Sequence, residues 1–171
     1  MPWLIITVLL ALATPLLVPA TATAAQTVAV FPFELLDSSQ KGELIVKVKP
    51  EETKRLVLLA DDLANRLAAT SRFEVVPVTG LAAEIEAAAP LHKCNGCEVE
   101  LAKKSGARFA MVGLVQKFSD TLLSVSIQVV DTQSGAIKAY SAGVQGNTDE
   151  AWLRGVSYLV RNRLLMEGTA Q

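Results

Sequence analysis

Two cysteines, Cys94 and Cys97, form the pattern with the clearest chemical meaning. They are the only cysteines among the 171 residues, and they enclose Asn95 and Gly96. Asn and Gly together allow the tight turn that a bridge across two residues requires. If the protein is exported, the pair is interpreted as a structural disulfide, and closing so short a loop would stabilise the fold by about 2 kcal/mol.

Two other interpretations of the cysteine pair remain open. The pair lies at the start of a predicted helix, where backbone N–H groups stabilise a thiolate, so it could be redox-active. His92 stands two residues before Cys94, and an imidazole with two thiolates would suit Cu(I) or Zn(II). A closed tetrahedral zinc site needs a fourth ligand, and the chain has no further Cys or His to supply it. We therefore expect no cofactor, with His92, Cys94 and Cys97 as the alternative metal site.

Motifs of the common enzyme classes are missing from the sequence. It contains no phosphate-binding loop, no dinucleotide-binding fingerprint, no nucleophile elbow and no paired-histidine zinc motif. His92 is the sole histidine, so any catalytic triad would depend on it. Asp61 and Asp62 would point about 100° apart on a helix and are interpreted as a solvated edge. The sequence therefore predicts a protein that is not an enzyme.

Polar residues near the end of the chain offer a second kind of candidate site. Arg154 and Arg161 are seven residues apart on a predicted final helix and share one face. The simpler interpretation is that these arginines complement the helix dipole, and that Asn147 caps the helix with Glu150 at the third position. The functional alternative is that Arg154, Arg161, Asn147 and Asp149 form a surface for a protein partner.

The first 25 residues contain no charged side chain and predict a secretory signal peptide. A mostly apolar run is followed by the small residues 20–25, and we expect cleavage after Ala24 or Ala25. This assigns residues 1–25 to the signal peptide and 26–171 to one domain. The apolar run is shorter than the roughly 20 residues that span a bilayer. We expect a periplasmic or secreted protein with no stable membrane insertion after cleavage.

The charge balance excludes some classes of partner. The chain has 16 Lys and Arg against 17 Asp and Glu, a formal net charge of -1 at pH 7. No strong field of one sign is available to attract nucleic acid or an anionic membrane surface. The expected partner is another envelope protein, which the sequence does not identify.

The first half of the domain predicts a βαβ unit. Residues 27–33 are continuously apolar and predict a strand buried on both faces, which ends near Pro32 because proline lacks an N–H. Residues 44–49 alternate and predict a short edge strand, with an extended loop as the alternative. Residues 51–70 carry apolar side chains at helical spacing, and residues 72–78 predict the second strand.

The second half predicts helices followed by a hairpin. We expect a short helix at 80–89 and a second helix at 95–105 that ends at Gly106. A buried strand at 109–115 follows, and then a hairpin formed by 123–129 and 136–144. A final helix carries its apolar stripe at Trp152, Val156, Leu159 and Val160. Together these elements predict an α/β fold, with one mixed sheet of about five strands and helices packed on it.

Four segments resemble a known family of exported bacterial proteins. They are Val28 to Phe33, Leu91 to Glu98, Val112 to Lys117 and Gly146 to Trp152. These segments are similar to the family called domain of unknown function 2380, over nearly the whole chain after the leader. More distantly, the order of elements resembles the small α/β domain of TolB amino-terminal and CsgG-like proteins. The resemblance implies this fold, export and docking on another envelope protein. It implies no established activity and no catalytic residue.

Overall fold

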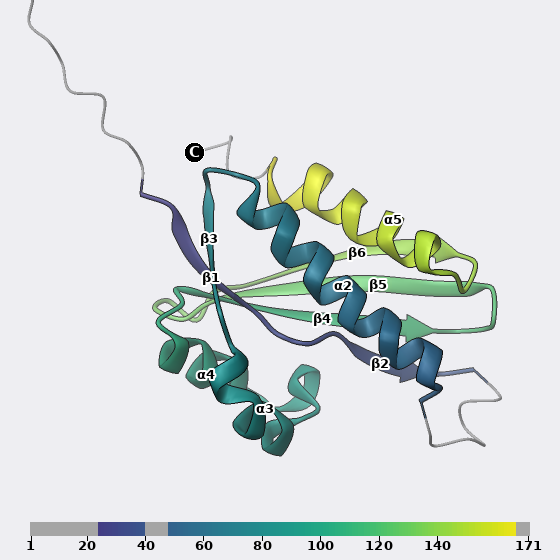
Figure 1. Ribbon diagram of the computed structural model, residues 1–171, viewed down its shortest axis with the longest axis horizontal. Helices are drawn as coiled ribbons and strands as arrows, with labels where there is room; N and C mark the ends of the chain where they lie inside the picture. Colours follow the sequence, from purple (N-terminus) through teal and green to yellow (C-terminus); the bar gives the residue numbers. More distant parts are fainter. Residues whose placement is uncertain (1–23, 40–47, 167–171) are drawn as a thin grey trace, which may run out of the picture.

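The computed structural model describes residues 24–39 and 48–166. Within these ranges the chain forms one six-stranded mixed sheet with helices on both faces (Figure 1). Most of the predicted signal peptide, and most of the predicted strand at 44–49, lie outside the described residues.

The sheet combines a parallel part and an antiparallel part. Its strands are β1 (Gln26–Val30), β2 (Glu34–Asp37), β3 (Phe73–Val76), β4 (Phe109–Lys117), β5 (Leu122–Asp131) and β6 (Ile137–Gln145). They are ordered β3-β1-β4-β5-β6, and β2 also pairs with β4. The parallel β1 and β3 pair confirms the predicted βαβ unit, and the antiparallel β5 and β6 pair confirms the predicted hairpin. The mixed α/β class is confirmed, with six strands in place of about five.

Strand β2 is the element that the sequence pattern does not predict. It continues along the same side of β4 as β1, with Val30 opposite Met111 and Glu34 opposite Leu114. Four residues therefore advance on one chain while three advance on β4, which is the geometry of a bulge. Pro32 lies between the two paired segments, where its missing N–H breaks no ladder hydrogen bond. The first strand therefore ends near Pro32, as the sequence predicts.

The helices lie close to their predicted positions. They are α2 (Pro50–Ala68), α3 (Ala82–Ala88), α4 (Cys97–Ser105) and α5 (Asp149–Leu159), with 3-10 turns at Thr79–Leu81 and Leu91–Lys93 and a π-helical turn at Val160–Leu164. Gly106 ends α4 in the left-handed conformation at φ 82°, as expected. The predicted cap of α5 is wrong. Thr148 is the N-cap, and its hydroxyl accepts from the Ala151 N–H at 3.2 Å, because Asn147 is bound elsewhere.

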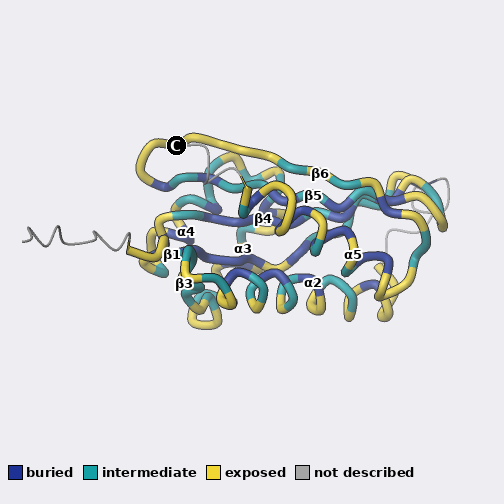
Figure 2. Tube along the Cα trace, turned by 90° about the horizontal axis from the view of Figure 1, so that it is seen from above, coloured by how far each residue is buried: buried dark blue, intermediate teal, exposed yellow. Residues whose placement is uncertain are grey.

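Two apolar cores lie on the two faces of the sheet. In Figure 2 the central strands β1 and β4 are mostly buried. Helices α2 and α5 cover one face, where Leu59, Leu63 and Trp152 are fully buried. Helices α3 and α4 cover the other face over β1 and β4, and bury Ile85 and Leu101. Strands β1 and β4 are therefore buried on both faces, which explains their continuous apolar sequence.

Candidate functional site

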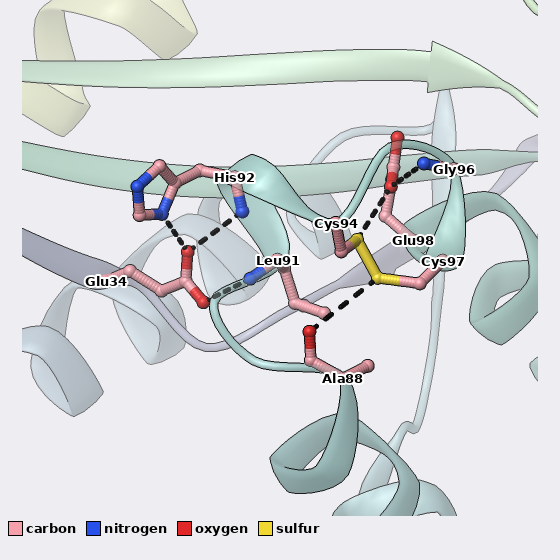
Figure 3. Close-up of a disulfide and its surroundings, with 8 residues drawn as sticks. All are labelled: Glu34, Ala88, Leu91, His92, Cys94, Gly96, Cys97 and Glu98. Carbon is pink, nitrogen blue, oxygen red and sulfur yellow. Dashed lines mark hydrogen bonds and ion pairs between the residues drawn. A yellow bond between two sulfur atoms is a disulfide. The ribbon is translucent and has the colours of Figure 1, made fainter.

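Cys94 and Cys97 form a disulfide at the start of α4 (Figure 3), with their Cα atoms 5.6 Å apart. Asn95 and Gly96 between them have positive φ angles of 53° and 109°, the conformation that Asn and Gly tolerate best. Both cysteines are partly buried and pack against the core beneath α3 and α4. The bridge therefore closes the turn that leads into α4, and its two cysteines pack against the core beneath the helix.

A buried carboxylate lies beside the disulfide. Glu98 is 6% exposed, and its Oε2 accepts a hydrogen bond from the Gly96 N–H at 3.1 Å. The same oxygen lies 3.2 Å from Cys94 Sγ. Among the described residues, Cys94, Cys97 and Glu98 form a group whose possible ligand atoms all lie within 4.8 Å of one another. In the disulfide the two sulfurs are not thiolates, so this group would need reduction before it could hold a soft metal.

His92 lies next to this group in sequence but points toward strand β2. Its Nδ1 is 2.6 Å from Glu34 Oε2, and Glu34 also accepts hydrogen bonds from the Leu91 N–H at 2.5 Å and the His92 N–H at 3.0 Å. The Glu34 carboxylate thus anchors the loop after α3 to β2 (Figure 3). The structure brings Cys94 and Cys97 together with Glu98, and it pairs His92 with Glu34.

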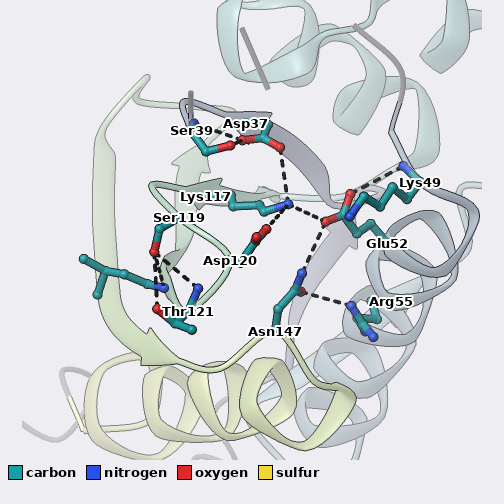
Figure 4. A network of polar contacts seen from close by, with 11 residues as sticks. Asp37, Ser39, Lys49, Glu52, Arg55, Lys117, Ser119, Asp120, Thr121 and Asn147 are labelled. Atoms are coloured by element: carbon teal, nitrogen blue, oxygen red, sulfur yellow. Dashed lines mark hydrogen bonds and ion pairs between the residues drawn. The ribbon is translucent and has the colours of Figure 1, made fainter. Parts of the chain in front are cut away.

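A second polar cluster, which we call the Lys117 network, lies at the C-terminal end of β4 (Figure 4). Lys117 is 2% exposed, and its Nζ lies 2.9 Å from Glu52 Oε1, 3.4 Å from Asp37 Oδ2 and 3.6 Å from Asp120 Oδ1. Glu52, in the first turn of α2, is equally buried. One buried ammonium group therefore holds β2, β4 and α2 together.

Opposing influences fix the charge state of the Lys117 network. Burial is the largest single influence on Glu52 and would raise its pKa, but the hydrogen bond and charge of Lys117 outweigh it and hold the pKa below its ordinary value. Burial likewise would lower the pKa of Lys117, but the carboxylates of Glu52 and Asp37 raise it. Burial would also raise the pKa of Asp37, but hydrogen bonds from Ser39 and the charge of Lys117 stabilise its carboxylate and lower the pKa. The amine is protonated and enclosed, so it acts as an anchor and not as a base or nucleophile.

The network also explains the placement of two predicted surface residues. Asn147 donates to Glu52 Oε1 at 3.4 Å and accepts from Arg55 Nη1 at 3.0 Å. Asp149 accepts from Arg55 Nε at 2.6 Å. Both residues therefore join the start of α5 to α2.

The free edge of β6 is the most accessible feature of the sheet. In the described part of the chain, no strand pairs with the outer side of β6. The Asp131 N–H donates to the Ala136 carbonyl, and the Gly146 N–H donates to the Thr121 carbonyl. The register places the two residues of each pair opposite each other, so both are hydrogen-bonded pairs of the antiparallel ladder. Such pairs recur at every second residue.

The outward-facing backbone groups of β6 follow from this alternation. The even-numbered residues direct their N–H and C=O groups to β5, and the odd-numbered residues direct theirs outward. Those outward residues are Ile137, Ala139, Ser141, Gly143 and Gln145. Charged side chains are one means by which edge strands resist pairing, and the only one in β6 is Lys138.

A groove of about 750 Å³ runs between β6 and α5, and we call it the β6 groove. Its lining residues are Leu122, residues 141–145, Ala151, Arg154, Gly155 and Tyr158. Leu122 is 50% exposed and Tyr158 is 44% exposed. Gly155 lets the helix approach the sheet, because a Cβ there would lie 2.8 Å from a methyl group of Val144.

Among the residues that the structure describes, Arg154 is the only charged one that lines the β6 groove. It is exposed, and it has no ion-pair partner within residues 24–39 and 48–166. Arg161 is exposed in the π-helical turn beyond α5 and does not line the groove. Of the four predicted surface residues, the structure therefore places Arg154 alone in the groove.

Sequence reasoning missed the Lys117 network and the β6 edge. A lysine at the end of a strand gives no sign that it will be buried, and the partners of Lys117 in β2 and α2 lie far away in the sequence. The low charge of β6 was visible, but its position at the edge depends on the strand order. Among the described residues, no helix is both long and apolar enough to cross a membrane.

Comparison with known proteins agrees with the family resemblance found in the sequence. The family described as "Protein of unknown function (DUF2380)" matches residues 26–164. No curated protein matches the chain.

Several solved structures are similar. The LpoB C-terminal domain from Salmonella enterica has a TM-score of 0.49 and 18% identity, over 73% of this chain and 86% of that chain. The LpoB C-terminal domain from Escherichia coli has a TM-score of 0.47 and 15% identity, over 74% and 87%. The PelC dodecamer from Paraburkholderia phytofirmans has a TM-score of 0.47 and 14% identity, over 81% and 88%. The neighbours are small α/β domains, and they match the distant likeness to TolB and CsgG-like domains only loosely.

Proposed function

The chain belongs to the DUF2380 family of unknown function, and we propose that it is an exported, non-enzymatic module that binds an extended segment of another envelope protein along the free edge of β6. The observation that carries this proposal is the open edge itself. Five residues of β6 direct backbone donors and acceptors outward, and a segment of another protein could satisfy them by adding a seventh strand.

The β6 groove would supply side-chain specificity for such a strand. Leu122 and Tyr158 present apolar surface beside the edge, and Arg154 presents a guanidinium that has no ion-pair partner among the described residues. Tyr and Arg, with Trp, are the residue types enriched at the energetic centres of interfaces. The expected occupant is an extended segment with an acidic residue that meets Arg154 and an apolar residue that meets Tyr158.

Export is supported by two features of different kinds. The uncharged, apolar leader has the composition of a signal peptide. The Cys94–Cys97 disulfide suits an oxidising compartment such as the periplasm. The non-enzymatic part of the proposal is supported by the two buried polar clusters, in which His92 and Lys117 are already bound to carboxylates.

The experiment selects a displayed library of random peptides of about ten residues, the length of β6, on the oxidised mature protein. Enriched peptides are then synthesised, and their affinity is measured by calorimetry. Ser141→Pro removes one outward N–H, which an edge strand tolerates, and we expect it to weaken binding about tenfold. Ser141→Ala keeps that N–H and should bind as the wild type does.

A second variant tests the groove independently of the backbone. Arg154→Glu reverses the charge at the groove, and it should weaken acidic peptides while Arg161→Glu, a matched change outside the groove, leaves them unaffected. Unfolding curves of each variant establish that it is folded. Peptides that bind Ser141→Pro and Arg154→Glu as tightly as the wild type would contradict the proposed docking site.

A further inference from the structure

The turn that leads into α4 brings together three side chains that can bind a metal ion (Figure 3). Cys94 Sγ, Cys97 Sγ and a carboxylate oxygen of Glu98 all lie within 4.8 Å of one another. His92 is the third ligand that the sequence pattern suggests, but the structure pairs its Nδ1 with Glu34 and leaves it outside this group. None of the three grouped residues lines the β6 groove, so an inference about them does not depend on the proposed docking site.

Glu98 is a buried carboxylate that no side-chain cation compensates. It is 6% exposed, and among the described residues it forms no ion pair. Its Oε2 accepts a hydrogen bond from the Gly96 N–H at 3.1 Å and lies 3.2 Å from Cys94 Sγ. A sulfur in a disulfide carries no proton, so in the oxidised protein it donates nothing to this oxygen. Buried carboxylates are usually paired with a cation or bound to a metal, and here the carboxylate is held against two sulfurs.

Backbone hydrogen bonds hold the turn independently of the bond between the sulfurs. The Cys94 N–H donates to the Leu91 carbonyl at 3.3 Å, and the Val99 N–H donates to the Gly96 carbonyl at 3.1 Å. Glu34 fixes the preceding loop by accepting from the Leu91 N–H. Both cysteines also pack against the core beneath α3 and α4. We therefore expect the two cysteine side chains to stay adjacent when the disulfide is reduced.

We propose that the reduced form of the protein binds one Zn(II) ion through Cys94, Cys97 and Glu98. A dithiol reductant gives two electrons and two protons to the disulfide, which becomes two thiols, and the reductant itself becomes a disulfide. Zn(II) then binds both sulfurs as thiolates together with the carboxylate, and the two thiol protons pass to the solvent. The zinc ion is neither oxidised nor reduced. Because the same two sulfurs form either the disulfide or the zinc site, the two states exclude each other.

The set of donor atoms favours zinc over other common metals. Thiolates suit Zn(II) and Cu(I), whereas Mg²⁺ and Ca²⁺ prefer oxygen ligands alone. A carboxylate is a regular ligand of zinc and a poor match for the soft Cu(I) ion. Among the described residues, no fourth His, Cys, Asp or Glu belongs to the group. Three protein ligands leave the fourth tetrahedral position to water, so the proposed site is an open one.

The test is a zinc titration of the protein in both redox forms. The protein is reduced with dithiothreitol, freed of the reductant on a desalting column without oxygen, and titrated with zinc sulfate in competition with a chromophoric chelator. We expect one Zn(II) ion per chain in the reduced form and none in the oxidised form. Co(II), used as a spectroscopic probe, should give the thiolate charge-transfer bands and the intense visible bands of a tetrahedral site. Circular dichroism establishes whether the reduced protein is folded.

Variants of single residues identify the third ligand. Glu98→Gln keeps the shape of the side chain and removes its charge. It should weaken zinc binding at least about tenfold, because even residues that only orient a zinc ligand contribute about ten- to a hundredfold to affinity. Glu100→Gln is the matched control on the same helix, since Glu100 is exposed and pairs with Lys103, and it should bind zinc as the wild type does. His92→Gln tests the ligand suggested by the sequence and should also leave the affinity unchanged.

The double variant Cys94→Ser/Cys97→Ser tests the two sulfurs. It lacks both thiolates, so it should bind no zinc under the same conditions and should not give the charge-transfer bands with Co(II). A reduced protein that is unfolded or that binds no zinc would overturn the proposal. So would an unchanged zinc affinity in Glu98→Gln, or a loss of affinity in His92→Gln as large as the loss in Glu98→Gln.

Discussion

Removing the Lys117 side chain tests the most deeply buried polar contact of the fold. The side chains of Lys117 and Glu52 are 2% and 3% exposed, with 2.9 Å between Nζ and Oε1. Lys117→Met keeps the length of the side chain and removes its charge, so the Glu52 carboxylate stays buried without its cation. Breaking a buried pair in this way costs about 3–5 kcal/mol. The free energy of unfolding of a native protein is about 5–15 kcal/mol in total, so this loss is a large share of it.

The assay is urea unfolding at pH 7, followed by the fluorescence of Trp152, which is fully buried in the core next to the network. The matched control is Lys104→Met. Lys104 pairs with Glu84, but both side chains are about half exposed, and such surface pairs contribute at most about 1 kcal/mol. If Lys117→Met lowers the free energy of unfolding by no more than Lys104→Met does, the reasoning about the buried pair is refuted.

A double variant separates the cost of an unpaired charge from the value of the pair. Lys117→Met/Glu52→Leu removes both charges and leaves no buried carboxylate at position 52. We expect its free energy of unfolding to exceed that of Lys117→Met, because a well-packed apolar pair often replaces a buried ion pair at little cost. Additive losses from the two single changes would show that the two side chains are not coupled.

Three further predictions follow from other contacts. The pKa values of Glu52 and Asp37 are lower in the folded protein than in the unfolded chain, so both carboxylates stabilise the fold at a pH above their unfolded pKa values and lose this contribution as the pH falls through their folded pKa values. Urea unfolding should therefore show that the free energy of unfolding falls below about pH 5. This fall should be smaller in Glu52→Gln. Changing both cysteines to serine should lower the free energy of unfolding by about 2 kcal/mol and leave peptide affinity unchanged, whereas loss of binding with stability retained would favour a thiol function. Gly113→Ala should cost about 1–3 kcal/mol in the same assay, because the new methyl would lie 2.5 Å from the Phe33 ring, and Gly143→Ala, which meets nothing within 4 Å, is its control.

Local periodicity was sufficient to predict most of the fold. The helical spacing of apolar residues located α2 and α5, and the alternation in β5 located the hairpin, because both patterns come from which side chains are buried. The parallel pairing of β1 and β3 followed from the continuous apolar run at residues 27–33. Strand β2 was missed because it is short and half-buried, and its pairing depends on β4 more than 70 residues later.

The candidate site was less predictable, for reasons of distance along the chain. Asn147 was expected to cap α5, but the local pattern could not show that Arg55 and Glu52 of α2 bind it. Arg154 was identified from its helical position, and its place in a groove became clear only with the strand order. An edge strand is defined by the absence of a neighbour, which no local pattern encodes.

Residue-resolved amide hydrogen exchange of the protein, free and with a selected peptide bound, tests the docking site most directly. In the free protein, the outward amides of β6 should exchange rapidly and the even-numbered amides slowly, because only the latter bond to β5. On binding, protection should appear at the outward amides of Ile137, Ala139, Ser141, Gly143 and Gln145. Protection confined to other elements, with these amides still exchanging rapidly in the complex, would contradict strand addition at β6.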